Sequence, residues 1–301
     1  MKKILFVIFI FSFFSQVHAQ GEAAVPFLLI EPSARVNGLA GSFTAVANDA
    51  NALFYNPAGI SSINYGSFEY SKYEFYRFYH FPDLYIRFLS STFRIPNIGS
   101  FGIDLTYYFL GEHIITDEVG NELGTFESKE WALSLGYAKK LNFYTSFGAS
   151  FKIIRSELGS FQVGSMGPDN NTGFAFDVGI LFNNFLPDLC FKKRFIDFKY
   201  QEYLQHRTFS EPSIGIVIKN IGPHMTYISE VKDPLPQQLR IGAAWNIVDT
   251  DIINLLILSD VRKLLVKRDK LDSDQFYQAW FTSWEDFSFN QLKFSAGIEV
   301  T

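Results

Sequence analysis

From residue 66 to the end of the chain, large apolar side chains alternate with small or polar ones. Residues 129–138 are a clear case, because one face holds large side chains, namely Trp131, Leu133, Leu135 and Tyr137. A period of two is the signature of a β-strand whose faces meet different surroundings. The pattern predicts about ten strands, at residues 66–79, 84–95, 99–109, 129–138, 143–153, 174–182, 214–218, 239–247, 251–261 and 292–300.

The connections between these strands differ in length. Pro96 with Asn97, and the step around Asn142, indicate short turns, whereas four polar or mixed stretches are long. We expect loops at residues 111–128, 159–171 and 262–287, and an insertion at 183–211. The first strand is the least regular, since its aromatic residues lie on both faces, and we expect a bulge or an interfacial stretch there.

The face of small residues carries three charges of interest. Asp104, Asp177 and Arg240 fall on this face, which we expect to point inward, because a charge on a lipid-exposed face costs roughly 2–4 kcal/mol near the bilayer midplane. They are the candidate lumen-facing residues. Small inward side chains fit either a wide pore or a closely packed interior, and the pattern leaves both open.

Composition narrows the class of protein. Aromatic residues make 18% of the chain and hydrophobic residues 48%, yet no apolar run approaches the about 20 residues that a membrane-spanning helix needs. A sheet with a lipid-facing wall fits these numbers, and a soluble sandwich is the competing possibility. A net charge of −5 gives no basic patch for nucleic acid.

The first residues predict export. Lys2 and Lys3 precede an apolar run, and a small residue, Ala19, ends the segment, which is the pattern of a cleavable signal peptide over residues 1–19. The chain has one cysteine, Cys190, so no internal disulfide is expected, and no cysteine stands at the cleavage point to carry a lipid anchor.

Residues 25–60 differ from the rest because they show no strand pattern. Small residues crowd positions 38–50, which would let this backbone pass close to surrounding walls. Pro57 favours an extended conformation at Asn56, because the proline ring disfavours the helical region for the residue before it. The segment is therefore expected to be short, kinked and compact.

Three phrases carry a resemblance to a known family. Residues 31–41 hold Glu31, Pro32, Ala34, Arg35, Gly38, Ala40 and Gly41 in the order of a conserved phrase of the PorV/PorQ family. Residues 47–59 add an A-x-D-A step followed by F-Y-N-P-A-G, and residues 233–243 read D-P-L-P-x-x-L-R-x-G-A. The chain resembles this family, and more distantly the FadL-like outer-membrane transporters.

The resemblance implies an all-β fold: a transmembrane antiparallel β-barrel of about fourteen strands around an N-terminal helical hatch. The implied division is a signal peptide at 1–19, the hatch at 20–62 and the barrel at 63–301. Since the pattern gives about ten strands and Thr301 is not the usual terminal aromatic residue, we expect about four strands to be missing from this sequence.

The implied function is a non-enzymatic carrier or docking role in type IX protein secretion. Its partners would be outer-membrane lipid, secretion-system proteins and exported cargo. The alternative is a FadL-like channel for a hydrophobic small ligand. In either case the hatch is the candidate site, through Arg35, Gly38, Gly41, Phe54, Asn56, Pro57, Ala58 and Gly59.

Catalytic chemistry finds no support in the sequence. No nucleophile elbow, zinc-protease motif or phosphate loop is present, and His80, His113, His206 and His224 stand far apart. We therefore predict no enzyme activity, no metal and no cofactor. The predicted signal peptide and the resemblance together imply a location in the outer membrane. A soluble periplasmic enzyme is the least favoured alternative.

Overall fold

The computed structural model of the chain describes residues 23–64, 66–75, 83–117, 119–159, 170–183, 212–226, 232–249, 253–269, 272–285 and 287–301. The predicted signal peptide, most of the 159–171 loop and nearly all of the 183–211 insertion lie outside these residues. Within them, no helix is long and apolar enough to cross a bilayer.

Ten strands form one antiparallel sheet, in the order β1-β2-β3-β4-β5-β6-β7-β10-β11-β14. Neighbours in the sheet follow chain order throughout. The strands are β1 Ser67–Glu74, β2 Tyr85–Ile95, β3 Gly99–Thr116, β4 Glu122–Lys140, β5 Thr145–Glu157, β6 Asn170–Phe182, β7 Ser213–Ile221, β10 Gln238–Asp249, β11 Asn254–Leu264 and β14 Leu292–Val300. The predicted all-β class and the approximate number of strands are confirmed.

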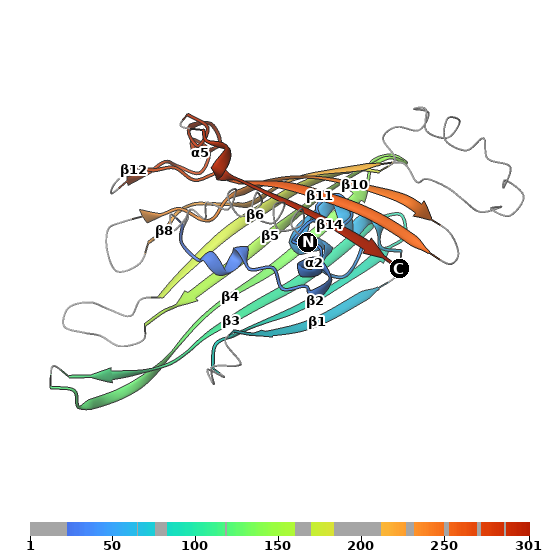
Figure 1. Ribbon diagram of the computed structural model, residues 1–301. Coiled ribbons are helices and arrows are strands. Elements are labelled where there is room, and N and C mark those ends of the chain that lie inside the picture. The colour runs from blue at the N-terminus through green and yellow to red at the C-terminus, as the bar shows by residue number, and fades with distance from the viewer. Residues whose placement is uncertain are drawn as a thin grey trace, which may run out of the picture.

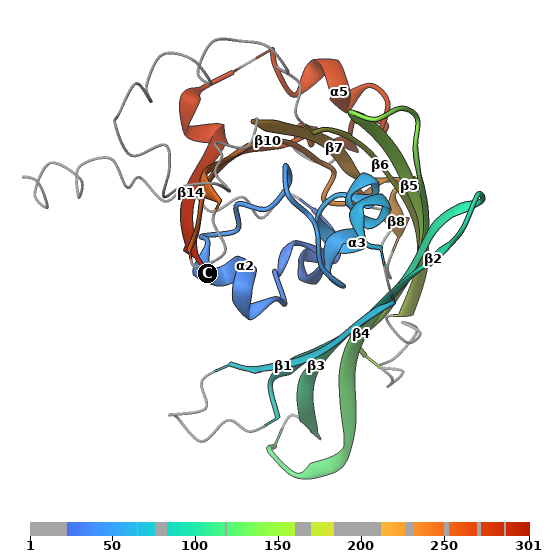
Figure 2. The same ribbon diagram turned by 90° about the vertical axis from the view of Figure 1, so that its right-hand side faces the viewer.

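The sheet is strongly curved, and the N-terminal segment lies on its concave side (Figures 1 and 2). Viewed along the strands, the sheet forms most of a ring, with β1 and β14 on either side of its open part (Figure 2). In the described part of the chain, each of these two edge strands pairs with one neighbour only.

The N-terminal segment consists of short helical turns joined by irregular backbone. They are η1 Pro26–Leu29, α2 Ala34–Gly38, α3 Ala52–Tyr55 and η2 Pro57–Ser62. Two clusters of buried apolar side chains join this segment to the concave face, one around Phe43, Leu53 and Phe88, the other around Phe27 and Ile154. The hydrophobic core therefore lies between the sheet and the N-terminal segment.

The two faces of the sheet differ as the alternation predicts. Ser146, Ser150 and Lys152 of β5 face the concave side and are buried. The convex face exposes large apolar side chains, among them Leu135 (51%), Phe147 (40%), Phe176 (53%), Ile241 (45%) and Phe294 (66%). Such a wide apolar surface is unusual for a protein surrounded by water.

The prediction of a loop at residues 111–128 is wrong. Strand β3 continues to Thr116 and β4 begins at Glu122, and residues 110–116 pair with residues 122–128 in a two-stranded ribbon that projects beyond β2 and β5 (Figure 1). Most side chains of this ribbon are polar, as expected for strands whose two faces are both exposed. The hydrophobic alternation therefore stops here, although the backbone pairing continues. A register shift precedes Gly111, which has a φ of 103°.

Two further expectations need correction. The first strand ends at Glu74 and pairs with β2 without a bulge, whereas residues 76–79 lie outside the described part. The 262–287 stretch is partly regular: β11 runs to Leu264, and β12 Arg268–Asp269, β13 Asp272–Ser273 and helix α5 Ala279–Thr282 follow. The remaining short elements are β8 Met225–Thr226, β9 Lys232–Asp233 and η4 Phe289–Gln291.

Candidate site between the N-terminal segment and the sheet

Asn56 connects the N-terminal segment to itself and to the sheet. Its backbone is extended (φ −153°, ψ 107°), as Pro57 predicts, and its Oδ1 accepts a hydrogen bond from the Ala58 N–H at 3.1 Å. Its Nδ2 donates to the carbonyls of Thr44 (2.9 Å) and Ile180 in β6 (3.3 Å). One buried amide thus caps η2, holds a preceding turn and contacts the wall.

Glycines of the sheet allow this close approach. A Cβ at Gly148 of β5 would lie 2.3 Å from the carbonyl carbon of Pro57, and one at Gly179 of β6 would lie 2.1 Å from Asn56 Oδ1. At Gly215 of β7 the nearest atom would be the Thr44 carbonyl oxygen, also at 2.1 Å. No other residue type fits these positions without movement, so the small concave face belongs to a closely packed interior.

Glu31 pairs with two arginines of the sheet. Its Oε1 accepts hydrogen bonds from Arg240 Nη2 at 2.6 Å and Arg262 Nη1 at 2.5 Å. Arg240 lies in β10 with its side chain 2% exposed, and its Nε donates to Gln238 at 2.5 Å. Burying a guanidinium is costly unless a carboxylate compensates its charge. Glu31 supplies that carboxylate to the buried guanidinium of Arg240.

Arg35 binds the far edge of the sheet. Its Nε and Nη2 donate to both carboxylate oxygens of Glu299 in β14, at 2.7 and 2.8 Å, and its Nη1 donates to Asp49 at 2.8 Å. The guanidinium also lies 4.9 Å from the Phe43 ring centroid. The hydrogen bonds to Glu299 raise the pKa of Arg35 above its usual value, although burial opposes this, so the side chain stays charged.

Asp260 holds the middle of the segment. Its Oδ2 accepts hydrogen bonds from the backbone N–H groups of Phe43 and Thr44, both at 3.2 Å, and from the Thr44 hydroxyl at 2.6 Å. Two backbone donors that no helix uses are thereby satisfied. The turn at residues 43–44 is fixed to β11.

A second group of buried charges lies within the sheet. Lys152 Nζ is 3.2 Å from Asp177 Oδ2 and 2.7 Å from Asn220 Oδ1. Asp177 Oδ1 also accepts the Asn220 N–H at 2.7 Å. Asp104 is 3% exposed and lies opposite Ser134, which is itself opposite Lys152. These polar groups face the N-terminal segment rather than bulk water.

Aromatic side chains fill the space between the charged groups. Phe54 makes edge-to-face contacts with Tyr55 and Phe88, at centroid distances of 5.0 and 5.6 Å, and Lys219 Nζ lies 3.8 Å from its ring centroid. Tyr55 is fully buried, and burial raises its pKa well above the usual value. The hydroxyl is therefore neutral.

The predicted hatch residues occupy different surroundings. Pro57, Ala58 and Gly59 of η2 are buried against the sheet. Gly41 has a φ of 82°, and a Cβ there would meet Glu31 and Arg262. Gly38, in contrast, has open space where a Cβ would stand, so its small size is not required by a close contact.

Several contact residues lie outside the predicted set of site residues. Glu31 belongs to the phrase shared with the family, and Lys152, Asp260, Arg262 and Glu299 lie in strands of the sheet. Alternation places each of these four strand residues on the face that points to the concave side. A charged residue on that face is the feature of the sequence that could have identified them. What the sequence lacks is the identity of the partner, because the pairs lie up to 264 residues apart.

The site holds the N-terminal segment against the sheet through ion pairs, hydrogen bonds and apolar contacts. Within the described ranges, no group of three or more His, Cys, Asp or Glu side chains is placed to hold a metal ion. Glu31, Arg35 and Lys152 form ion pairs, and Asp260 accepts hydrogen bonds from backbone donors. This arrangement fixes a folded segment inside a curved wall.

Comparison with known families agrees with this architecture. Residues 15–270 match the model of the family described as type IX secretion system protein PorV. Comparison with curated proteins finds no match. The match covers most of the chain, including the N-terminal segment and all but the last of the ten strands, and it confirms the resemblance seen in the sequence. The chain therefore belongs to the PorV family of type IX secretion system proteins.

Proposed function

We propose that this chain is an outer-membrane β-barrel protein that serves type IX secretion as a non-enzymatic carrier or docking component. In this proposal residues 1–19 are a signal peptide cleaved near Ala19, residues 20–62 are a hatch, and residues 63–301 belong to the barrel. Family membership supports the secretion role. Its partners would be outer-membrane lipid, other secretion proteins and exported cargo.

The convex face supports a membrane location. A wall of exposed Leu, Ile and Phe side chains is what lipid-facing strands present. Open edges cannot persist in hydrocarbon, because unpaired backbone groups there cost several kcal/mol each. In the described part of the chain β1 and β14 each pair with one strand only, so a location in the membrane requires these two edges to be covered.

The filled interior is the observation that favours docking over passage. Glycines of three strands contact the N-terminal segment, and ion pairs from Glu31 and Arg35 tie it to β10, β11 and β14. An uptake channel for a hydrophobic small molecule, the alternative, requires this segment to move. A docking protein can keep it fixed and offer its outer surfaces.

A disulfide between the segment and the wall separates these functions. Ser42 Oγ lies 2.9 Å from Ser295 Oγ in β14, so cysteines at both positions can reach the bonding distance of a disulfide. The double variant Ser42→Cys, Ser295→Cys is made with Cys190→Ser to avoid mispairing. Secretion of cargo is then measured in a strain lacking the natural gene, before and after reduction.

We expect the gene deletion to leave cargo in the periplasm and the oxidised variant to restore secretion fully. Cargo that is secreted normally without the gene would refute the secretion role. Loss of secretion on oxidation and recovery on reduction would show that the segment must move during secretion, and would contradict a segment that stays fixed. The single variants Ser42→Cys and Ser295→Cys control for the substitutions themselves.

A further inference from the structure

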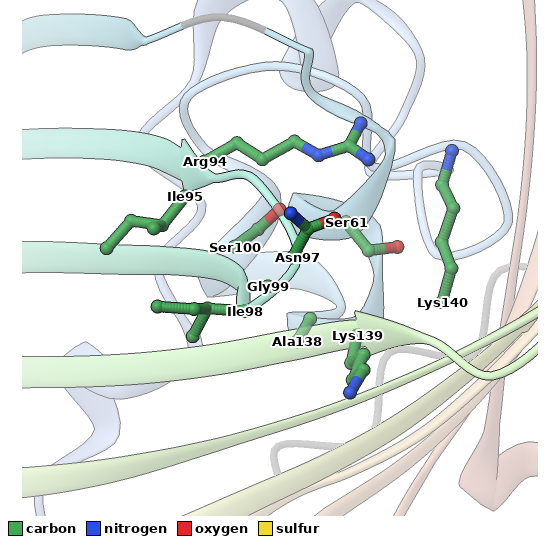
Figure 3. Close-up of a pocket in the computed structure, with 10 residues that line it drawn as sticks. All are labelled: Ser61, Arg94, Ile95, Asn97, Ile98, Gly99, Ser100, Ala138, Lys139 and Lys140. Carbon is green, nitrogen blue, oxygen red and sulfur yellow. The ribbon is translucent and has the colours of Figure 1, made fainter.

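A pocket of about 180 Å³ lies at the end of the sheet where the short turns are, beside the last turn of η2. The turn between β2 and β3 forms one wall and the end of β4 forms the other (Figure 3). The Tyr137 hydroxyl donates to the Ile98 carbonyl at 2.7 Å and joins these walls.

Three cations and, among the residues that the structure describes, no carboxylate line this pocket. They are Arg94, Lys139 and Lys140, all exposed. Among the described residues, none of the three has a carboxylate within ion-pair distance. Four cations that contact the N-terminal segment or the buried polar groups differ from these three, because Arg35, Lys152, Arg240 and Arg262 each pair with a carboxylate.

The polar groups around these charges differ in what they can offer a ligand. Arg94 donates to Asn64 Oδ1 through Nη1 at 3.0 Å, which leaves other donors of the guanidinium. In Figure 3 the side chains of Arg94 and Lys140 extend toward the same side of the pocket, with Asn97 and Ser61 between the walls, whereas Lys139 points the other way. The Ser61 hydroxyl donates to the Ala58 carbonyl and so can only accept.

From this geometry we propose that the pocket binds a phosphate group, held by Arg94 and Lys140 with the Asn97 amide as a further donor. A guanidinium offers paired donors that match phosphate oxygens, and an ammonium supplies a point charge. The site is separate from the contacts of the N-terminal segment with β10, β11 and β14. It does not depend on the proposed role in secretion.

The phosphate has two possible sources. Ile95 and Ile98 lie at the pocket and are exposed (37% and 52%), and Phe93 continues this apolar strip along the convex face. A lipid whose headgroup enters the pocket can place its chains there. Free phosphate, or a soluble phosphate ester, needs only the polar part of the site.

The test uses the full chain purified in neutral detergent. Inorganic phosphate is titrated by calorimetry, and retained phosphatidylglycerol is counted by mass spectrometry after transfer into nanodiscs with and without that lipid. The variant Arg94→Gln, Lys140→Gln removes both charges. Its matched control, Arg87→Gln with Lys129→Gln, removes two cations of the same strands that lie away from the pocket, near the start of β2 and within β4.

We expect the pocket variant to bind at least about tenfold more weakly, since hydrogen bonds to charged groups are the strong ones, and the control to match the wild type. Saturable binding of inorganic phosphate identifies a soluble source, and retention of phosphatidylglycerol alone identifies a lipid. If neither probe distinguishes the pocket variant from the wild type, the proposal is wrong. If the double variant misfolds, the single variant Lys140→Gln is measured in its place, because this side chain is exposed.

Discussion

Glu31 is the residue on which the position of the N-terminal segment depends most. It is the carboxylate that pairs with both Arg240 and Arg262, and the Arg240 side chain is only 2% exposed. A buried ion pair contributes little net stability, but removing one partner leaves a buried charge without compensation. The effect of losing Glu31 should therefore exceed what its hydrogen bonds alone suggest.

We predict that Glu31→Gln lowers the free energy of unfolding by about 3–5 kcal/mol, measured by urea titration in detergent. Glu285→Gln is the matched control, because Glu285 pairs with Lys267 at 2.5 Å while 61% of its side chain is exposed, and exposed pairs contribute about 0–1 kcal/mol. Similar losses in the two variants would show that Glu31 has no special structural role.

At the scale of elements, the contact between strands and the N-terminal segment requires the absence of side chains. Gly148 in β5 and Gly179 in β6 face the step at Asn56 and Pro57. At Gly148 the nearest atoms belong to the backbone of Pro57 and Ala58, which cannot rotate away as a side chain can. The strand and the segment must therefore separate if a methyl group is added.

We predict that Gly148→Ala destabilises the protein by about 1–3 kcal/mol, the range for overpacking a well-packed site. Gly38→Ala makes the same chemical change where no atom lies within 4 Å. It should be neutral or should stabilise α2 by up to about 1 kcal/mol, because alanine favours helices. Urea midpoints measure both, and a tolerated Gly148→Ala would contradict the close packing described above.

At the scale of the whole molecule, the question is what surrounds the convex face. Phe176 lies on that face in the middle of β6 and is 53% exposed. Leu123 is similarly exposed, at 59%, but lies in the projecting ribbon of residues 110–128. In water the two positions would tolerate charge equally, whereas in the proposed membrane only Phe176 meets lipid.

We predict that Phe176→Lys costs about 2–4 kcal/mol and reduces the fraction that assembles into the outer membrane. Leu123→Lys should assemble like the wild type. Assembly is measured by cell fractionation and by the shift of unheated samples on gels. Equal assembly of both variants, or recovery of the wild type in the soluble periplasmic fraction, would overturn the proposed membrane location.

Much of this architecture was available from local sequence. Period-two alternation located the strands of the sheet and assigned Asp104, Asp177 and Arg240 to the concave face. The proline at position 57 predicted the extended backbone of Asn56. Such features depend on neighbouring residues, and a short-range pattern records them. Alternation did not predict the ribbon formed by residues 110–116 and 122–128, because strands that are exposed on both faces do not alternate between hydrophobic and polar residues.

Tertiary structure decided what lies inside the curve of the sheet. Small inward residues were compatible with a pore or a filled interior, and only the packing of Pro57 and Asn56 against Gly148 and Gly179 selects the filled one. The ion pairs of Glu31 with Arg240 and Arg262, and that of Arg35 with Glu299, join residues more than 200 positions apart. A charged residue at a position predicted to be buried indicates that it needs a partner of opposite charge. Only the folded chain brings that partner within hydrogen-bond distance.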